Sequence, residues 1–215
     1  MKNERTTDRK KNRRKIVGML IWIGVFLCAG NTMAQQKQAS GASMLAVQQD
    51  KQQRSPAADY TFTDSLGKLV KLSDFRGKWL MADVWYSGCG GCITANQGLR
   101  TVHDSLAKAG VVFLSISVDK EREKWMASVT AGAGKSKMNP WAGMYVPAVG
   151  TVVLYTSGSG HDNEFRKSYV PDNLYPKLLL FDPAGNLVAD NPPRPDSKPE
   201  LLISFIRQQQ RAISR

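Results

Sequence analysis

The sequence predicts an α/β domain with a central mixed β-sheet, helices on its flanks and a β-hairpin at its N-terminus. Three observations lead to this prediction. A strand–turn–strand pattern at 60–72 opens the domain. Two apolar runs, 79–86 and 111–118, enclose a segment with helical spacing, and this order implies a parallel strand pair with a right-handed crossover. A second strand–turn–strand pattern at 177–189 is followed by a closing helix.

The first half of the domain contains the hairpin, a buried strand and a long helix. Residues 60–63 alternate apolar and polar side chains, Asp-Ser-Leu-Gly forms a turn, and 69–72 return as the second strand. The apolar run at 79–86 is typical of a buried strand. Gly110 is suited to end the helix that follows. That helix places apolar residues spaced by three and four on one face: Cys92, Ala95, Leu99, Val102 and Leu106.

The second half of the domain alternates strands with shorter helical segments. Residues 111–118 form a second buried strand, and Asp119 is expected to cap a helix that includes 121–129. The Gly- and Ala-rich region 131–149 shows no clear pattern. The remaining expected elements are a strand at 151–155, a helical turn or two at 164–169, hairpin strands at 177–181 and 186–189, and a helix at 197–209. This last helix is expected to turn four residues inward: Leu201, Leu202, Phe205 and Ile206.

An export signal is predicted in front of the domain. Residues 1–15 hold eight Lys or Arg and two Asp or Glu, a net charge of +6 out of +12 for the chain, and an apolar stretch follows at 16–30. This stretch is short for a membrane span but suits a signal peptide cleaved after Ala34, at 1–34; an uncleaved signal anchor is the alternative. A lipoprotein is disfavoured, because Leu27 is bulky where a small residue should precede Cys28.

The rest of the chain divides into a linker and the folded domain. The region 35–58 is rich in Gln, Ala, Ser and Lys and is expected to be a flexible linker, whereas 59–215 holds the domain. The other +6 of net charge is spread over 16–215 without a basic stripe interleaved with aromatic residues, which disfavours nucleic-acid binding. The protein is therefore expected to be exported, and to contact a membrane only through an uncleaved N-terminal segment.

The most informative motif is Cys89-Gly90-Gly91-Cys92. It begins the helix, where free backbone N–H groups and the helix dipole favour a thiolate at Cys89, and Cys92 lies one turn on to close a small disulfide. A structural disulfide would stabilise little across so short a loop. A structural zinc site usually needs four Cys or His ligands, and the chain offers only three others: Cys28, His103 and His161. The motif therefore favours reversible dithiol–disulfide chemistry.

The region from Asp59 to Ile206 resembles the TlpA-like thiol-disulfide oxidoreductases of the bacterial envelope, which belong to the thioredoxin superfamily. The resemblance rests on the fourteen-residue stretch WLMADVWYSGCGGC and on LYPKLLLFD, which contains Pro176. Pro192-Pro193-Arg194-Pro195 before the last helix is similar to members of this family from Bacteroidetes-type bacteria. The resemblance implies a thioredoxin-like fold.

The resemblance also implies roles for individual positions. Cys89 corresponds to an exposed attacking thiol and Cys92 to a buried resolving thiol. Pro176 matches a cis-proline that faces the disulfide and keeps the backbone of Tyr175 available to an extended substrate segment. Asp83, six residues before Cys89, matches a buried carboxylate whose raised pKa suits it to exchange a proton with Cys92.

Two further positions of the site carry expectations. Trp85 is expected to pack beside the disulfide and to contribute to substrate binding. Gly91 stands where the family commonly has a proline, which departs from the pattern. Because the dipeptide between the thiols helps set the reduction potential, the sequence leaves open whether the protein reduces, isomerises or oxidises disulfides.

The sequence thus predicts a periplasmic thiol-disulfide oxidoreductase that exchanges its Cys89–Cys92 disulfide with envelope proteins, as a reductase or isomerase. A membrane reductase is expected to donate electrons, because no flavin or nicotinamide fingerprint is present, and no cofactor or metal is expected.

Two alternatives on a related fold stay open. A peroxiredoxin-like peroxidase wants Thr or Ser three residues before its reactive Cys and Pro four residues earlier, where this chain has Tyr86 and Ala82. A metal-binding assembly chaperone uses a C-x-x-x-C spacing with a partner His, for which His161 is the one loose candidate.

Overall fold

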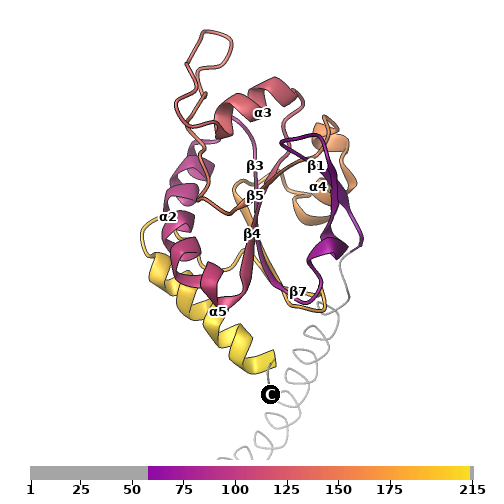
Figure 1. The fold of residues 1–215 in the computed structure, drawn as a ribbon, viewed down its shortest axis with the longest axis vertical. Helices are drawn as coiled ribbons and strands as arrows, with labels where there is room; N and C mark the ends of the chain where they lie inside the picture. The colour runs from indigo at the N-terminus through magenta and orange to yellow at the C-terminus, as the bar shows by residue number, and fades with distance from the viewer. Residues whose placement is uncertain (1–57, 214–215) are drawn as a thin grey trace, which may run out of the picture. The chain divides into compact units, whose positions relative to one another are not determined.

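The structure is a computed structural model that describes residues 58–213, whose strands form a seven-stranded mixed sheet (Figure 1). The strand order across the sheet is β2-β1-β5-β4-β3-β6-β7. The strands are β1 (Thr61–Asp64), β2 (Leu69–Lys71), β3 (Trp79–Trp85), β4 (Val111–Ser117), β5 (Val152–Tyr155), β6 (Lys177–Phe181) and β7 (Leu187–Asp190). The α-helices are α2 (Gly90–Leu106), α3 (Arg122–Val129), α4 (Glu164–Tyr169) and α5 (Pro199–Ile213), with short 3-10 turns η1 (Leu72–Phe75), η2 (Ala107–Ala109) and η3 (Gly160–Asp162).

The sheet has a parallel centre and antiparallel edges. Strand β4 lies between β3 and β5 and runs parallel to both, in a register that pairs Trp79 with Val111 and Trp85 with Ser117. The two predicted hairpins, β1–β2 and β6–β7, are antiparallel, as are the pairs β1–β5 and β3–β6. The mixed sheet and the parallel pair around α2 are therefore confirmed.

Helices cover both faces of the sheet. Figure 1 shows α2 and α5 on one side of the strands and α4 on the other. Side chains alternate between these faces along a strand. Met81 of β3 therefore belongs to the same buried cluster as Leu99 of α2 and Leu202 of α5, whereas its neighbour Ala82 belongs to the cluster that contains Phe165 of α4. The residues of β3 are all buried, as the continuous apolar run predicts.

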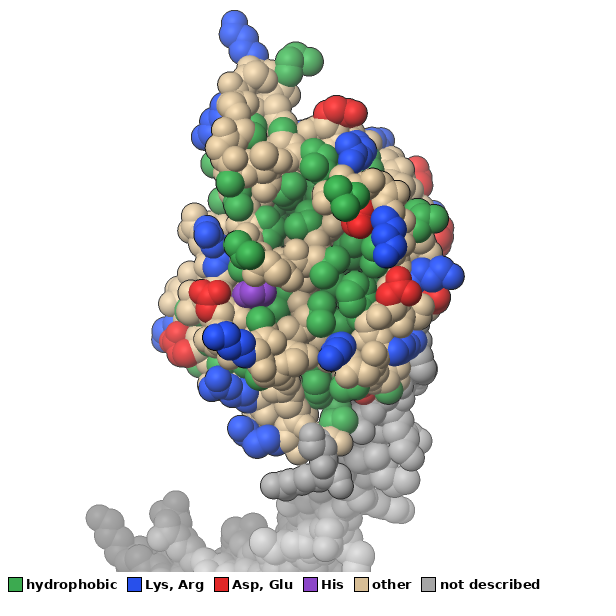
Figure 2. Space-filling view, viewed as in Figure 1, with side chains coloured by type: hydrophobic (Ala, Val, Ile, Leu, Met, Phe, Trp, Pro, Cys, Tyr) green, Lys and Arg blue, Asp and Glu red, His purple; other side chains and the backbone are tan. Residues whose placement is uncertain are grey.

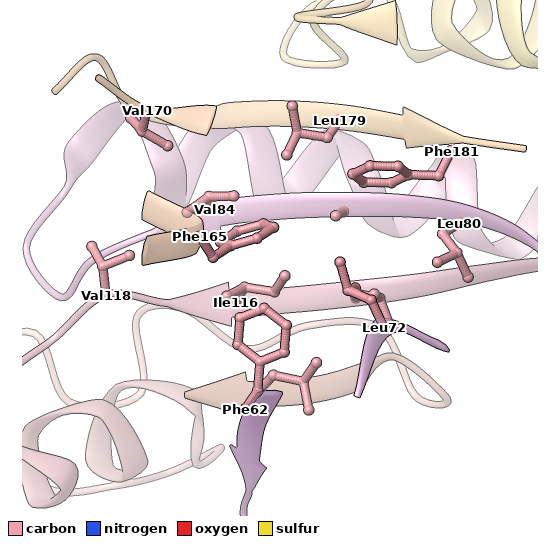
Figure 3. Packing of buried hydrophobic residues seen from close by; sticks show 13 residues of the cluster. Phe62, Leu72, Leu80, Val84, Ile116, Val118, Phe165, Val170, Leu179 and Phe181 are labelled. Carbon is pink, nitrogen blue, oxygen red and sulfur yellow. The ribbon is translucent and has the colours of Figure 1, made fainter. Parts of the chain in front are cut away.

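The face beneath α4 carries a cluster of hydrophobic side chains (Figure 3). Phe62 of β1 and Phe165 of α4 meet edge to face, with ring centroids 5.1 Å apart, and both rings are almost fully buried. Leu80 and Val84 of β3 reach the same cluster, which ties the N-terminal hairpin to the centre of the sheet. Burial of each such side chain contributes about 1.5–3 kcal/mol, so this face is a main source of stability.

The helix after the motif forms as its spacing predicts. Helix α2 begins after Cys89 and buries the five expected residues together with Asn96. It continues through the 3-10 turn η2 to Gly110, which adopts a left-handed conformation with φ of 81°. Gly110 thus ends the 3-10 turn rather than the α-helix itself, whose C-cap is Ala107.

Two local expectations are wrong. Asp119 does not cap α3, whose N-cap is Glu121. The carboxylate of Asp119 accepts hydrogen bonds from Ser87 and Ser117 instead. Leu201 of α5 is 51% exposed, whereas Leu202 is fully buried. Adjacent helical residues point about 100° apart, so both leucines cannot face the sheet.

The region 130–149 contains no helix or strand, and Figure 1 shows the segment after α3 projecting beyond that helix. Its far part returns to the domain, where Gly143 N–H donates to Ala127 O (2.8 Å) and Tyr145 N–H donates to Ser128 O (3.0 Å). The strands and short helix that follow, β5, α4, β6 and β7, lie within one residue of their predicted bounds.

The predicted signal segment, 1–34, and nearly all of the predicted linker lie outside the described residues. Between residues 58 and 213, no helix has the length and apolar character to cross a membrane.

Candidate functional site

The two cysteines of the motif form a disulfide at the N-terminus of α2, with Cα atoms 5.2 Å apart. Cys89 is the N-cap residue, and the backbone N–H of Cys92 donates to its Sγ at 3.1 Å. Cys89 is 5% exposed and Cys92 is fully buried, so Cys89 is the more accessible of the two cysteines, although little of it reaches solvent. The same N–H group and the helix dipole would stabilise a thiolate on Cys89 after reduction.

Pro176 lies against the motif. The Tyr175–Pro176 peptide bond is cis. A Cβ placed on Gly91 would lie 3.6 Å from Pro176 Cδ and 3.9 Å from Tyr175 O, which puts the proline and the preceding carbonyl beside the dipeptide between the cysteines. The half-buried Tyr175 ring meets the exposed Tyr86 ring edge to face, with centroids 5.2 Å apart.

Asp83 lies on β3 with its side chain buried on the α2 side of the sheet. Its Oδ2 accepts a hydrogen bond from the Tyr145 hydroxyl, whereas Oδ1 has no hydrogen-bond partner within the described residues. Burial raises the pKa of this carboxyl to about 7, with the hydrogen bond from Tyr145 acting in the opposite direction. Such a group changes its protonation near neutral pH.

A small cavity of about 20 Å³ separates Asp83 from α2. Asn96 also lines it, and Asn96 lies four residues after Cys92 on the same buried face of the helix. The cavity is large enough for about one water molecule and has polar groups in its wall, including those of Ser115 and Tyr145. The carboxyl and the buried cysteine therefore share one side of the sheet.

Trp85 is fully buried beneath the motif. Its Nε1 donates to Ser115 Oγ at 2.9 Å, and its ring stacks on Tyr145 with centroids 3.6 Å apart and planes 7° apart. The packing role expected for Trp85 fits this position. The expected contact with substrate does not, because the side chain has no surface to offer a partner protein.

The loop before Cys89 is held by a buried polar network that sequence reasoning missed. Asp119 accepts hydrogen bonds from the Ser87 backbone N–H (3.0 Å) and from the hydroxyls of Ser87 and Ser117 (both 2.7 Å). Ser128 of α3 donates to Ser87 Oγ at 2.8 Å. Since Ser87 lies two residues before Cys89, the network fixes the approach to the reactive sulfur. The sequence did offer one signal for this network, because Asp119 directly follows the predicted buried strand at 111–118.

Trp141 also escaped the sequence analysis. Gly88 has a φ of 93°, and a Cβ placed on it would lie only 2.8 Å from Trp141 Nε1. The indole therefore lies against the backbone immediately before Cys89, and it remains 37% exposed. No local pattern links a tryptophan in an irregular loop to a glycine more than fifty residues earlier.

The segment before α5 packs on the other side of the motif. Arg194 pairs with Asp196 at 2.5 Å, and its Nη2 lies 3.5 Å from Gly91 O. This approach requires a glycine on α2, because a Cβ on Gly98 would lie 2.1 Å from Pro195 O. The tertiary structure thus gives the Pro-Pro-Arg-Pro stretch a place at the site.

Within residues 58–213, no three His, Cys, Asp or Glu side chains are grouped so that they could hold a metal ion. His161 lies in η3 and lines an open groove of about 420 Å³ that also includes Tyr86 and Tyr175. Asp119 and Glu121 line the same groove, but His161 and these two carboxylates are not among any group of three donors placed to hold a metal ion within the described residues.

Solved structures with the same fold come from bacterial thiol-disulfide oxidoreductases. The thioredoxin domain of one from Bacteroides vulgatus has a TM-score of 0.53 and 21% identity, covering 72% of this chain and 94% of its own. A putative thiol-disulfide oxidoreductase from the same species has a TM-score of 0.52 and 25% identity, and the match covers 73% of this chain and 90% of its own. A putative thiol:disulfide interchange protein DsbE from Chlorobium tepidum has a TM-score of 0.53 and 19% identity, and the match covers 70% of this chain and 95% of its own.

The sequence comparisons define the family. No curated protein sequence gives a significant match. Residues 53–189, well over half of the chain, match the AhpC/TSA family. The thioredoxin-like fold expected from the TlpA-like resemblance is confirmed by the solved structures. With its cysteine pair at the start of α2, the chain is a thioredoxin-like member of the AhpC/TSA family.

Proposed function

We propose that the protein is a thiol-disulfide oxidoreductase that exchanges the Cys89–Cys92 disulfide with thiols or disulfides of partner proteins. The observation that carries this proposal is the disulfide at the start of α2, with its more accessible cysteine at the N-cap and Pro176 beside it. The fold shared with thiol-disulfide oxidoreductases of Bacteroides supports the proposal.

The exchange runs in two steps. In the reducing direction, the Cys89 thiolate attacks a partner disulfide, forms one new S–S bond and releases one partner thiolate. Cys92 then loses its proton to the Asp83 carboxylate and attacks Cys89 Sγ. The Cys89–Cys92 bond forms, the bond to the partner breaks, and the partner leaves with both of its cysteines reduced. The two electrons gained by the partner come from the two thiols.

A partner protein would dock on the surface around Cys89. Three side chains near the motif expose apolar surface: Tyr86 (42%), Trp141 (37%) and Leu174 (66%). Figure 2 shows one face of the molecule, where hydrophobic side chains gather near the centre and Lys and Arg lie mostly toward the edges. In this proposal the backbone at Tyr175 pairs with an extended segment of the partner, as the TlpA-like resemblance implies.

The proposed location is the periplasm, reached through the signal segment at 1–34, with a membrane reductase restoring the dithiol. We further propose that the direction is reductive or isomerising. Equilibration of the cysteine pair against glutathione buffers measures this direction. A strongly reducing potential supports a reductase and a mild one an isomerase, whereas a potential near those of strong oxidants would contradict both.

The decisive experiment is trapping of the mixed disulfide. In Cys92→Ser the second step is blocked, so covalent complexes with partner proteins should accumulate and dissolve on addition of dithiothreitol. Cys89→Ser is the matched control and should trap nothing and lack exchange activity. If Cys92→Ser forms no mixed disulfide with any disulfide-bearing protein or peptide offered to it, the assigned roles are wrong.

The peroxidase alternative deserves a direct assay because of the family match at 53–189. The residue three positions before Cys89 is Tyr86, whose phenol packs on Tyr175. Consumption of hydrogen peroxide coupled to oxidation of Cys89, at a rate comparable to disulfide exchange, would favour this alternative.

A further inference from the structure

The irregular region 130–149 delivers one residue into the buried side of the site. Tyr145 is only 2% exposed, and its hydroxyl donates to Oδ2 of Asp83. Asn96 of α2 holds the next residue, because its Nδ2 donates to Val146 O at 3.0 Å. The backbone N–H of Tyr145 is itself bonded to Ser128 O of α3. Hydrogen bonds from α2 and to α3 therefore hold the backbone at 145–146 and so fix the position of the phenol.

Two properties make Tyr145 a permanent donor. Its ring is clamped by stacking on Trp85, so the hydroxyl has little freedom to turn away from Asp83. Burial and the neighbouring carboxyl raise the pKa of Tyr145 well above its usual value of 10, so the hydroxyl keeps its proton near neutral pH. One carboxylate oxygen of Asp83 is thus occupied at all times, and Oδ1 is left without a hydrogen-bond partner among the described residues. Asp83 also lines the small cavity that α2 lines.

We propose that Tyr145 is a positioning residue that holds Asp83 by Oδ2 and leaves Oδ1 to take the proton of Cys92 in the second exchange step. The inference rests on the proposed function. It also gives the region 130–149 a role inside the site, in addition to the Trp141 contact at the surface.

Other groups that act on Asp83 are few. On its own sheet, the paired residues Ser115 of β4 and Leu178 of β6 carry no charge. Helix α2 lines the cavity beside Asp83 with two uncharged residues, Asn96 and Leu99. The segment before α5 contributes a charge of each sign: Arg194, which lowers the pKa of Asp83, and Asp196, which raises it. Both lie behind Tyr145 in the strength of their effect on this carboxyl. Removal of the hydroxyl is therefore the cleanest way to change the environment of the acid.

The test compares Tyr145→Phe with Tyr155→Phe. Each variant removes a hydroxyl from a tyrosine that stacks on a tryptophan in the same buried cluster, but the hydroxyl of Tyr155 donates to a backbone carbonyl, Lys120 O. The carboxyl carbon of Asp83 is titrated by ¹³C NMR in the oxidised protein. We expect its midpoint to rise by about one pH unit in Tyr145→Phe, because a hydrogen bond to the charged form is lost. Tyr155→Phe should leave it unchanged. An unchanged or lower midpoint in Tyr145→Phe overturns the proposal.

The kinetic arm follows the second exchange step itself. Reduced protein is mixed with 5,5′-dithiobis(2-nitrobenzoate), and release of the second thionitrobenzoate reports the attack by Cys92 on the mixed disulfide. At pH 7 we expect Tyr145→Phe to be slower by about fivefold, since the ionised fraction of Asp83 would fall from about one half to about one tenth. The rate should recover above the new midpoint. A shifted titration with an unchanged pH–rate profile would overturn the role of Tyr145 as a positioning residue for the second exchange step.

A measurement on the wild-type protein keeps the test valid if Tyr145→Phe does not fold. The Cζ resonance of Tyr145 should titrate with the same midpoint as the Asp83 carboxyl, and absence of this coupling overturns the hydrogen bond. The proposed function fails separately, if wild-type protein releases no second thionitrobenzoate. The NMR titrations still decide whether Tyr145 controls Asp83 in that case.

Discussion

The two faces of the sheet differ in what they bury. The face beneath α4 packs hydrocarbon on hydrocarbon, from Phe62 of β1 to Phe181 of β6. The face beneath α2 and α3 starts in the same way, with Met81 and Phe113, but polar side chains follow toward the carboxyl ends of β3 and β4: Asp83, Ser115, Ser117 and, just beyond the strand, Asp119. Buried polar groups cost free energy unless they are hydrogen-bonded. The fold therefore concentrates this cost at the end of the sheet where the cysteines lie.

The two buried acids of the polar face are also treated differently. Asp119 accepts hydrogen bonds from one backbone N–H and two hydroxyls. Asp83 has one hydroxyl donor, and an oxygen without a partner among the described residues. The first arrangement fixes the loop that carries Ser87, and the second leaves a carboxyl whose pKa, near 7, permits a change of protonation. We infer that positioning and proton transfer are divided between the two acids.

The largest expected effect comes from the hydrocarbon face. Phe165→Ala removes a ring that contacts Phe62 and is 1% exposed, so we expect a loss of about 3–5 kcal/mol in the free energy of unfolding. Urea denaturation of the oxidised protein measures this loss. The titration midpoint of Asp83 should stay unchanged, since the ring lies on the opposite face. A loss below about 1 kcal/mol would show that this cluster does not carry the stability we assign to it.

On the polar face, Asp83→Asn should raise the free energy of unfolding relative to wild type, whereas Phe165→Ala lowers it, and the gain should depend on pH. The folded pKa of about 7 lies above the ordinary value of 3.8, so the contribution of Asp83 to the free energy of unfolding is largest below about pH 4 and falls as the pH rises from there to about 7. The loss amounts to roughly 4 kcal/mol, at about 1.4 kcal/mol for each tenfold change. Asp83→Asn lacks this loss.

Urea denaturation at pH 4.5 and pH 8 checks the expectation for Asp83. Relative to wild type, Asp83→Asn should gain stability between the two pH values, and its second exchange step should be slow, because an amide does not accept the proton. Asp182→Asn, at a carboxyl that holds the Asn186 turn of the β6–β7 hairpin, is the control for a general effect of losing a carboxylate. If the difference between Asp83→Asn and wild type does not grow with pH, the raised pKa is wrong.

The smallest expected effect comes from a pair of glycines on α2. A methyl group on Gly98 would meet Pro195 O at 2.1 Å, whereas one on Gly90 would meet nothing within 4 Å. We expect Gly98→Ala to destabilise the protein by about 1–3 kcal/mol, through displacement of the segment that carries Arg194. Gly90→Ala should stabilise it by up to about 1 kcal/mol. Thermal unfolding of both variants measures these changes as shifts of the melting temperature. Equal shifts of the same sign would contradict the close approach of Pro195 to Gly98.

Local patterns were sufficient for the framework of the fold. The continuous run of β3, the three-and-four spacing of α2 and the hairpin turn at Asp182–Gly185 each act over a few residues, so the sequence shows them directly. The patterns failed where neighbours compete. From the sequence, the helix after Asp119 is the obvious source of hydrogen-bond donors for its carboxylate. In the packed structure the donors are those of Ser87, which follows the neighbouring strand β3, and α3 begins after Glu121.

By itself, then, the sequence determined the cysteine pair at a helix start, the strands that flank it and the presence of an acid six residues earlier. Only the tertiary structure decided what surrounds that acid and the reactive sulfur: Tyr145, Trp141, Asn96 and Arg194. The physical reason is the separation along the chain of the residues that interact. Secondary structure follows from backbone periodicity, whereas these contacts join segments far apart in the chain through hydrogen bonds and packing that exist only once the sheet and α2 are assembled.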